Sequence, residues 1–200
     1  MSSVSSATKP LKPAERRALA EDLLVRYAPW FESRGFYLLS VEVASPFGAL
    51  TLAFYMDHLD RKASDGVTLS HCYEMTQAFL DVLDADKQLQ PLDYHLEVSS
   101  PGLFRELASA RELAFYQGSP VEISLPKRTA KLAKNPAYEA LAKRLKRPLK
   151  GVLASFDAEA KIISISPESA NAEASCQAAI TLPWDPSLMH VALSHTIHSL

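Results

Sequence analysis

The sequence predicts an α+β fold class, in which a two-layer N-terminal domain is followed by a small C-terminal β-barrel. Two observations predict it. Helical and strand-like hydrophobic periods follow the order α-β-β-α-β in the first half of the chain, and short alternating segments follow at close spacing in the second half. The length of 200 residues leaves room for one or two domains, and 48% hydrophobic and 22% charged residues are typical of folded proteins.

The first predicted element is a helix that begins at Pro13. Residues 1–12 are mostly Ser, Thr, Lys and Pro, and we expect them to form a disordered tail. Pro13 suits the first position of a helix, and Gly35 suits the position just past its end. Spacings of three and four residues define its apolar face, which consists of Leu19, Leu23, Tyr27, Trp30 and Phe31.

A β-hairpin is predicted after this helix. Residues 39–43 and 50–56 each alternate apolar with polar side chains, and the turn sequence Ser-Pro-Phe-Gly lies between them. In the first strand this alternation predicts that Leu39, Val41 and Val43 share one face.

A second helix and a third strand complete the N-terminal domain, which we place at residues 13–100. The third strand is predicted over 94–99, where apolar and polar residues alternate again. Two helices on one face of a three-stranded sheet would form the two layers. The second helix is predicted from the apolar stripe Cys72, Met75, Phe79, Leu80 and Leu83.

The second domain is predicted after a turn at Pro101 and Gly102, which fit the central positions of a type II turn. Residues 101–118 form an interdomain linker with a short helix, and residues 119–200 form the barrel domain. Short strands at close spacing are typical of a small β-barrel. The strands are predicted at 121–125, 149–156, 162–165 and 178–182.

The charge is distributed unevenly along the chain. The net charge of −2 by itself argues against a general nucleic-acid binder. Residues 127–150, here called the basic segment, nevertheless carry +8, whereas residues 1–126 carry −6 and residues 151–200 carry −4. The only acid of the basic segment is Glu139. Its basic residues are Lys127, Arg128, Lys131, Lys134, Lys143, Arg144, Lys146, Arg147 and Lys150.

The basic segment is predicted to hold a helix, inserted in a barrel loop at about residues 127–148. Asn135 is a suitable N-cap and Pro136 a suitable first helical residue, so the helix is expected over 136–147. Each Lys or Arg that contacts a phosphate releases counterions, so an exposed segment of this charge would bind an RNA backbone. A merely solvated helix face is the alternative interpretation.

Residues 94–105 read Tyr-His-Leu-Glu-Val-Ser-Ser-Pro-Gly-Leu-Phe-Arg. This stretch resembles the signature of the RimP family of bacterial ribosome maturation factors. The core of the resemblance is Leu96, Glu97, Val98, Ser99, Ser100, Pro101, Gly102 and Leu103. Residues 67–72, 80–84, 115–121 and 149–153 resemble further parts of the family's pattern.

The resemblance implies a fold, an activity and partners. The fold would be an N-terminal α+β domain and a C-terminal Sm-like or SH3-like barrel. The activity would be non-catalytic binding to the immature small (30S) ribosomal subunit in the cytoplasm, where ribosomal RNA and a basic ribosomal protein reach their mature arrangement. We therefore expect a monomer that is not an enzyme and has no cofactor and no membrane partner.

Arg105 is the candidate RNA contact within the motif, because a guanidinium matches a phosphate with two hydrogen bonds. The alternative is that the motif only fixes an interdomain turn. The chain departs from the family at Phe104 and Glu106, since an acidic residue and a proline usually flank the arginine. It also departs at His190, where a basic residue is usual, and the basic segment replaces a shorter loop.

Two other functions compete with ribosome maturation. An Sm-like RNA-binding regulator outside assembly would use the same basic surface. An enzyme would need an acid, a base and a nucleophile within hydrogen-bond reach, but alternate residues on a strand lie about 6.6–6.8 Å apart. The residues in question are Asp93, His95, Glu97 and Ser99.

Metal sites, disulfides and membrane spans are not expected. Three histidines near the C-terminus, His190, His195 and His198, lack a nearby Cys or a well-placed carboxylate. Cys72 and Cys176 lie far apart and outside any CxxC pattern, which favours free thiols in a reducing compartment. No run approaches about 18 consecutive apolar residues, and the N-terminus lacks the apolar core of a secretion signal.

Overall fold

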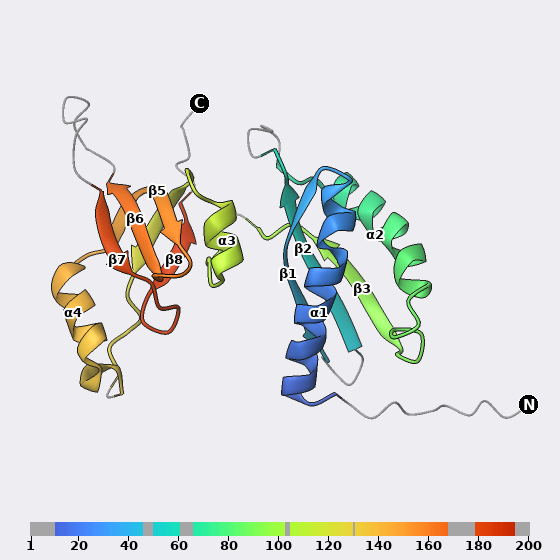
Figure 1. Ribbon diagram of the computed structural model, residues 1–200, viewed down its shortest axis with the longest axis horizontal. Helices are drawn as coiled ribbons and strands as arrows, with labels where there is room; N and C mark the ends of the chain where they lie inside the picture. Colours follow the sequence, from blue (N-terminus) through green and yellow to red (C-terminus); the bar gives the residue numbers. More distant parts are fainter. Residues whose placement is uncertain are drawn as a thin grey trace, which may run out of the picture. The chain divides into compact units, whose positions relative to one another are not determined.

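The computed structural model describes residues 11–45, 50–60, 66–102, 105–129, 131–167 and 179–194, and the chain divides into two compact units (Figure 1). The N-terminal unit is Met1–Pro101 and the C-terminal unit is Gly102–Leu200. The predicted tail at residues 1–12 falls almost entirely outside the described residues. Within the described ranges, no helix has the length and apolar character needed to cross a membrane.

The N-terminal unit has two helices and a three-stranded sheet in the predicted order, which confirms the α-β-β-α-β prediction. Its elements are α1 (Pro13–Glu32), β1 (Phe36–Ala44), β2 (Leu50–His58), α2 (Leu69–Asp84) and β3 (Tyr94–Ser99). β2 lies in the middle of the sheet, antiparallel to β1 and parallel to β3. Parallel neighbours need a crossover connection, and α2 supplies it between β2 and β3.

Both helices cover the same face of this sheet, because their buried side chains share one core with it (Figure 1). At its centre lie Phe31 of α1, Phe54 of β2 and Phe79 of α2, all fully buried. The ring centroids of Phe31 and Phe79 lie 5.0 Å apart, and those of Phe54 and Phe79 lie 4.8 Å apart. Burial of each ring contributes about 1.5–3 kcal/mol, so this aromatic centre holds both helices on the sheet.

A β-bulge changes the predicted face of β1. The pairing of β1 with β2 shifts register between Leu38 and Ser40, so Leu39 is an extra residue in the strand. The extra residue moves the alternation by one position, so Leu38 joins Val41 in the core cluster, whereas Leu39 is buried outside that cluster. The prediction that Leu39 shares the face of Val41 is therefore wrong.

The C-terminal unit is built on a five-stranded antiparallel sheet. Its elements are α3 (Ala110–Phe115), β4 (Pro120–Ser124), the 3₁₀ helix η2 (Leu132–Lys134), α4 (Pro136–Arg144), β5 (Leu149–Asp157), β6 (Ile162–Pro167), β7 (Ile180–Pro183) and β8 (His190–Leu193). The strand order is β7-β6-β5-β4-β8, so the last strand returns to pair with the first strand of the unit. The sequence pattern does not predict β8, because four residues are too few to show a clear alternation.

No closed barrel forms in the part of the chain that the structure describes. β7 and β8 are the two edges of the sheet, and no pairing joins them. The observed fold class is therefore α+β with two sheets. Gly151 in β5 allows β6 to approach closely, since a Cβ at this position would stand 2.3 Å from the carbonyl oxygen of Ser166.

The basic segment folds into α4 as predicted, although the helix ends at Arg144 and not at residue 147. The side-chain oxygen of Asn135 caps its start by accepting a hydrogen bond from the backbone N–H of Ala137 at 2.9 Å. Tyr138 and Leu141 are buried, and the Tyr138 hydroxyl donates to the carbonyl oxygen of Pro126 at 2.9 Å. The apolar face of α4 is thus packed, which leaves its charged residues at the surface.

Candidate nucleic-acid interface

All nine basic residues of the basic segment are exposed. Two of them pair with carboxylates: Arg128 lies 2.8 Å from Glu139, and the Lys150 ammonium lies 3.4 Å from the carboxylate of Glu122. Among the described residues, the other seven have no carboxylate partner. Exposed cations without a carboxylate partner remain available to phosphates.

One hydrogen bond ties the end of α4 to the sheet. Arg144 donates through Nη2 to the carbonyl oxygen of Thr181 in β7 at 2.9 Å. The chain then passes through an irregular turn to β5, because Leu145 leaves the helical conformation at φ −103° and ψ 71°. This bond holds the most basic part of the segment against β7.

A hollow of about 370 Å³ lies between the end of α4, the start of β5 and β7, and we call it the basic hollow. Cationic side chains and apolar side chains line it together, and no acidic residue does. The cations are Lys143, Arg144, Lys146 and Arg147. The apolar residues are Leu145, Pro148, Leu149, Ile180 and Leu182.

Arg105 does not lie on the surface as predicted. Its side chain is only 14% exposed and forms an ion pair with Glu112, which is 4% exposed. The second carboxylate oxygen of Glu112 accepts hydrogen bonds from the backbone N–H groups of Ala108 at 3.0 Å and Ser109 at 2.9 Å. Arg105 and Glu112 therefore anchor the start of α3, and this placement favours a structural role for Arg105 over an RNA contact.

The family motif is divided between core and surface. Leu96 and Val98 in β3 pack in or against the core of the N-terminal unit, whereas Glu97 and Ser99 are exposed on the opposite face of the sheet. Gly102 has φ +78°, a left-handed conformation that fits the predicted turn. Ser100 and Pro101 before it are half-buried, and Leu103 lies outside the described residues.

Two of the departures from the family pattern meet in space. Nδ1 of His190, in β8, contacts the carboxylate of Glu106. Glu106 also forms an isolated bridge with Ala192, and the backbone N–H of Leu107 donates to the carbonyl oxygen of Val191 at 2.6 Å. Sequence reasoning noted Glu106 and His190 separately but missed their contact, since 84 residues separate them.

The side chains that prompted the enzyme and metal hypotheses are not gathered into either hollow described here. Asp93, His95 and Glu97 are exposed and line neither the basic hollow nor the groove of the N-terminal unit. The described residues contain no cluster of His, Cys, Asp or Glu that could hold a metal ion. His195 and His198 lie outside those residues, as does Cys176.

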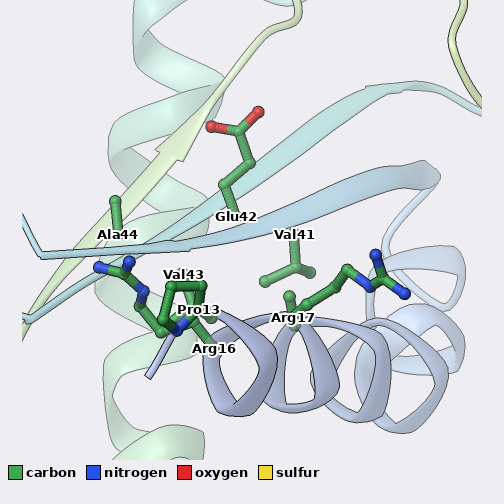
Figure 2. Close-up of a pocket in the computed structure, with 8 residues that line it drawn as sticks. Pro13, Arg16, Arg17, Val41, Glu42, Val43 and Ala44 are labelled. Carbon is green, nitrogen blue, oxygen red and sulfur yellow. The ribbon is translucent and has the colours of Figure 1, made fainter. Parts of the chain in front are cut away.

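The groove of the N-terminal unit lies between α1 and β1, has a volume of about 440 Å³, and is here called the β1 groove. Figure 2 shows Val41 pointing toward α1 and Glu42 pointing away from it. Arg16 and Arg17 of α1 also line the groove. Glu42 shares a row of the sheet with Ala53 and Glu97, so two exposed carboxylates stand on the face opposite the helices.

Carboxylates also organise an ion-pair network at the end of α2. Asp86 accepts hydrogen bonds from the Tyr27 hydroxyl at 2.7 Å and the backbone N–H of Gln88 at 2.8 Å, and it pairs with Arg26. Burial raises the pKa of Asp86, but the hydrogen bonds from Tyr27 and Gln88 and the charge of Arg26 outweigh it, so the pKa falls below its ordinary value. Burial and the bond to Asp86 raise the pKa of Tyr27 to about 12.

Comparison with known families bears directly on the N-terminal unit. The family model of the RimP N-terminal domain matches residues 27–104. The matched residues contain the end of α1 and all of β1, β2, α2 and β3, together with the motif from Leu96 to Leu103. The resemblance stated from the motif is thereby confirmed: residues 27–104 of this chain are similar to the N-terminal domain of the RimP family.

Proposed function

We propose that this chain is a non-catalytic maturation factor of the small ribosomal subunit, which binds ribosomal RNA through the basic segment. The match of residues 27–104 to the RimP N-terminal domain supports a role in ribosome maturation. The observation that carries the RNA contact is the exposure of all nine basic residues, seven of them without a carboxylate partner among the described residues. Phosphate contacts of this kind give affinity and position the protein.

The N-terminal unit supports a second contact, with a basic ribosomal protein. Residues 1–101 contain nine Lys and Arg against fourteen Asp and Glu, a net charge of −5. Glu42 and Glu97 are exposed in one row of the sheet, on the face opposite the helices. Complementary charge accelerates encounter and selects the partner. On this proposal the acidic unit attracts the protein while the basic segment engages RNA, in the cytoplasm.

The proposal includes an Sm-like arrangement of the C-terminal unit. A short helix, α3, precedes five antiparallel strands, and the last strand pairs with the first. That return of β8 to β4 is what supports the Sm-like assignment, which sequence resemblance suggested. A crystal structure of the chain in which this five-stranded sheet closes into a barrel would support the assignment, and a flat open sheet would contradict it.

A deletion strain tests the proposed function. We expect immature small subunits and precursor ribosomal RNA to accumulate, and the full chain to restore normal ribosome profiles. The variant Lys143→Glu/Lys146→Glu/Arg147→Glu should co-sediment poorly with small subunits and fail to restore them. This variant keeps Arg144, whose bond to Thr181 holds α4.

The competing function is RNA regulation outside assembly, which the same cationic surface favours because phosphate contacts carry no sequence information. Normal ribosome profiles in the deletion strain, together with altered messenger stability, would establish it and overturn the maturation role. Unchanged co-sedimentation of the triple variant at physiological salt would instead overturn the assignment of the RNA contact to the basic segment.

A further inference from the structure

The composition of the basic hollow indicates a particular kind of ligand. Its wall contains side chains that an apolar surface can pack against, and its edge contains four cations. Leu145, Leu149 and Ile180 are half-buried, whereas Lys143, Lys146 and Arg147 are exposed. A ligand that contacts both the apolar side chains and the cations of the hollow must carry an apolar face and a negative charge within a few ångströms of each other.

A nucleotide with an unpaired base has this combination. Its phosphate is anionic, and the flat face of its base packs on apolar side chains once it is unstacked. The volume of about 370 Å³ lies at the lower end of the range for small-ligand sites. A duplex offers phosphates only, because its base faces are stacked inside and the major groove of A-form RNA is deep and narrow.

Resting on the proposed function, we propose that the basic hollow binds one unpaired nucleotide of single-stranded RNA. Lys146 and Arg147 contact the flanking phosphates. Leu145 and Ile180 pack against the base. Arg144 positions the site, because its bond to the carbonyl oxygen of Thr181 keeps the end of α4 beside β7. The basic segment therefore distinguishes single-stranded from paired RNA and does not bind every backbone equally.

Fluorescence anisotropy with the full chain tests this proposal. The probes are a labelled RNA strand of about ten nucleotides, within the usual site size of single-strand binders, the same strand annealed to its complement, and the same backbone with abasic sites. We expect the intact single strand to bind about tenfold more tightly than the duplex or the abasic strand, since packing of a base is worth a factor of this order.

Two kinds of variant separate the base contact from the charge. Leu145→Asn and Ile180→Thr should abolish most of the preference for the intact strand over the abasic strand, and leave the affinity for the abasic strand unchanged. Lys146→Glu/Arg147→Glu should weaken binding to all three probes. Lys127→Glu/Lys131→Glu is the matched control, because it makes the same change of charge outside the hollow and should retain the preference.

The failure of this proposal differs from failure of the proposed function. Equal affinity for all three probes, with a loss of binding in Lys146→Glu/Arg147→Glu, would overturn the nucleotide site and leave the RNA contact in place. Preservation of the single-strand preference in both Leu145→Asn and Ile180→Thr would also overturn the site. No binding of any probe at about 0.15 M salt, by the full chain, would count against the RNA contact itself.

Discussion

The two units use their positive charges differently. In the N-terminal unit, Arg26 pairs with Asp22 and Asp86, and the guanidinium of Arg34 lies 3.8 Å from the centroid of the Trp30 ring system. In the basic segment of the C-terminal unit, seven of nine cations have no carboxylate partner among the described residues. Cations of the first kind stabilise the fold, whereas those of the second kind are available to a partner.

The difference shows why net charge is a poor guide to binding. The whole chain carries −2, yet its basic segment carries +8. Arg105 adds a further distinction, since it lies in the C-terminal unit but is paired with Glu112. Pairing and burial, and not the unit in which a cation lies, separate cations that stabilise from cations that bind. The following predictions test that separation.

The largest effect is expected from Glu112→Ala. The substitution removes the carboxylate that pairs with the mostly buried Arg105 guanidinium, and removing one member of a buried ion pair costs about 3 kcal/mol. Denaturant unfolding of the full chain measures this loss. Glu122→Ala is the control, because its pair with Lys150 is solvent-exposed and surface pairs contribute about 0–1 kcal/mol. Equal losses in the two variants would contradict a structural role for Arg105.

An intermediate effect is expected from reversal of two unpaired cations. Lys146→Glu/Arg147→Glu should lower the affinity for single-stranded RNA by about tenfold at physiological salt and reduce its salt dependence, because two phosphate contacts are lost. Arg16→Glu/Arg17→Glu in the β1 groove makes the same change of charge and should lower the affinity by less than about threefold. If the second variant weakened binding as much as the first, the affinity would come from the overall charge of the chain. Direct contacts of Lys146 and Arg147 with phosphates would then be contradicted.

The smallest of these effects is expected from Asp86→Asn, at about 1 kcal/mol near neutral pH, because hydrogen bonds to a charged acceptor become weaker bonds to a neutral one. The folded-state pKa of Asp86 lies below its ordinary value of 3.8. Its ionised form therefore stabilises the folded chain above pH 3.8, and this contribution is lost as the pH falls through the lower folded-state value. Thermal unfolding of both proteins from pH 7 to pH 3 should show converging stabilities. A constant difference would contradict the ionic contribution.

Local pattern predicted most of the secondary structure. The apolar spacing of Leu23, Tyr27 and Phe31 gave α1, and Asn135 with Pro136 gave the start of α4. The errors lie where distant residues decide the outcome. The bulge at Leu39 depends on how β1 pairs with β2. The strand β8 forms because residues 190–193 pair with β4, which lies far away in the sequence.

The candidate site was less predictable than the fold. Sequence identified every cation of the basic segment, since charge is a property of each residue. It did not identify the basic hollow, because Ile180 and Leu182 lie more than 30 residues beyond Arg147 and reach it only when β7 joins the sheet. It also placed Arg105 at the surface, since the partnership with Glu112 depends on how α3 begins.

The sequence by itself determined the resemblance to the RimP N-terminal domain, the order of helices and strands in the N-terminal unit, and the position of the charge that we assign to RNA. These follow from motif, periodicity and composition, which are local. Only the tertiary structure decided which cations are paired, which face of β1 is buried, that Glu106 meets His190, and where an apolar wall lies beside four cations. Each of these features depends on contact between two segments that are distant in the sequence. Burial of apolar side chains and pairing of charges stabilise the protein only once those segments are in contact.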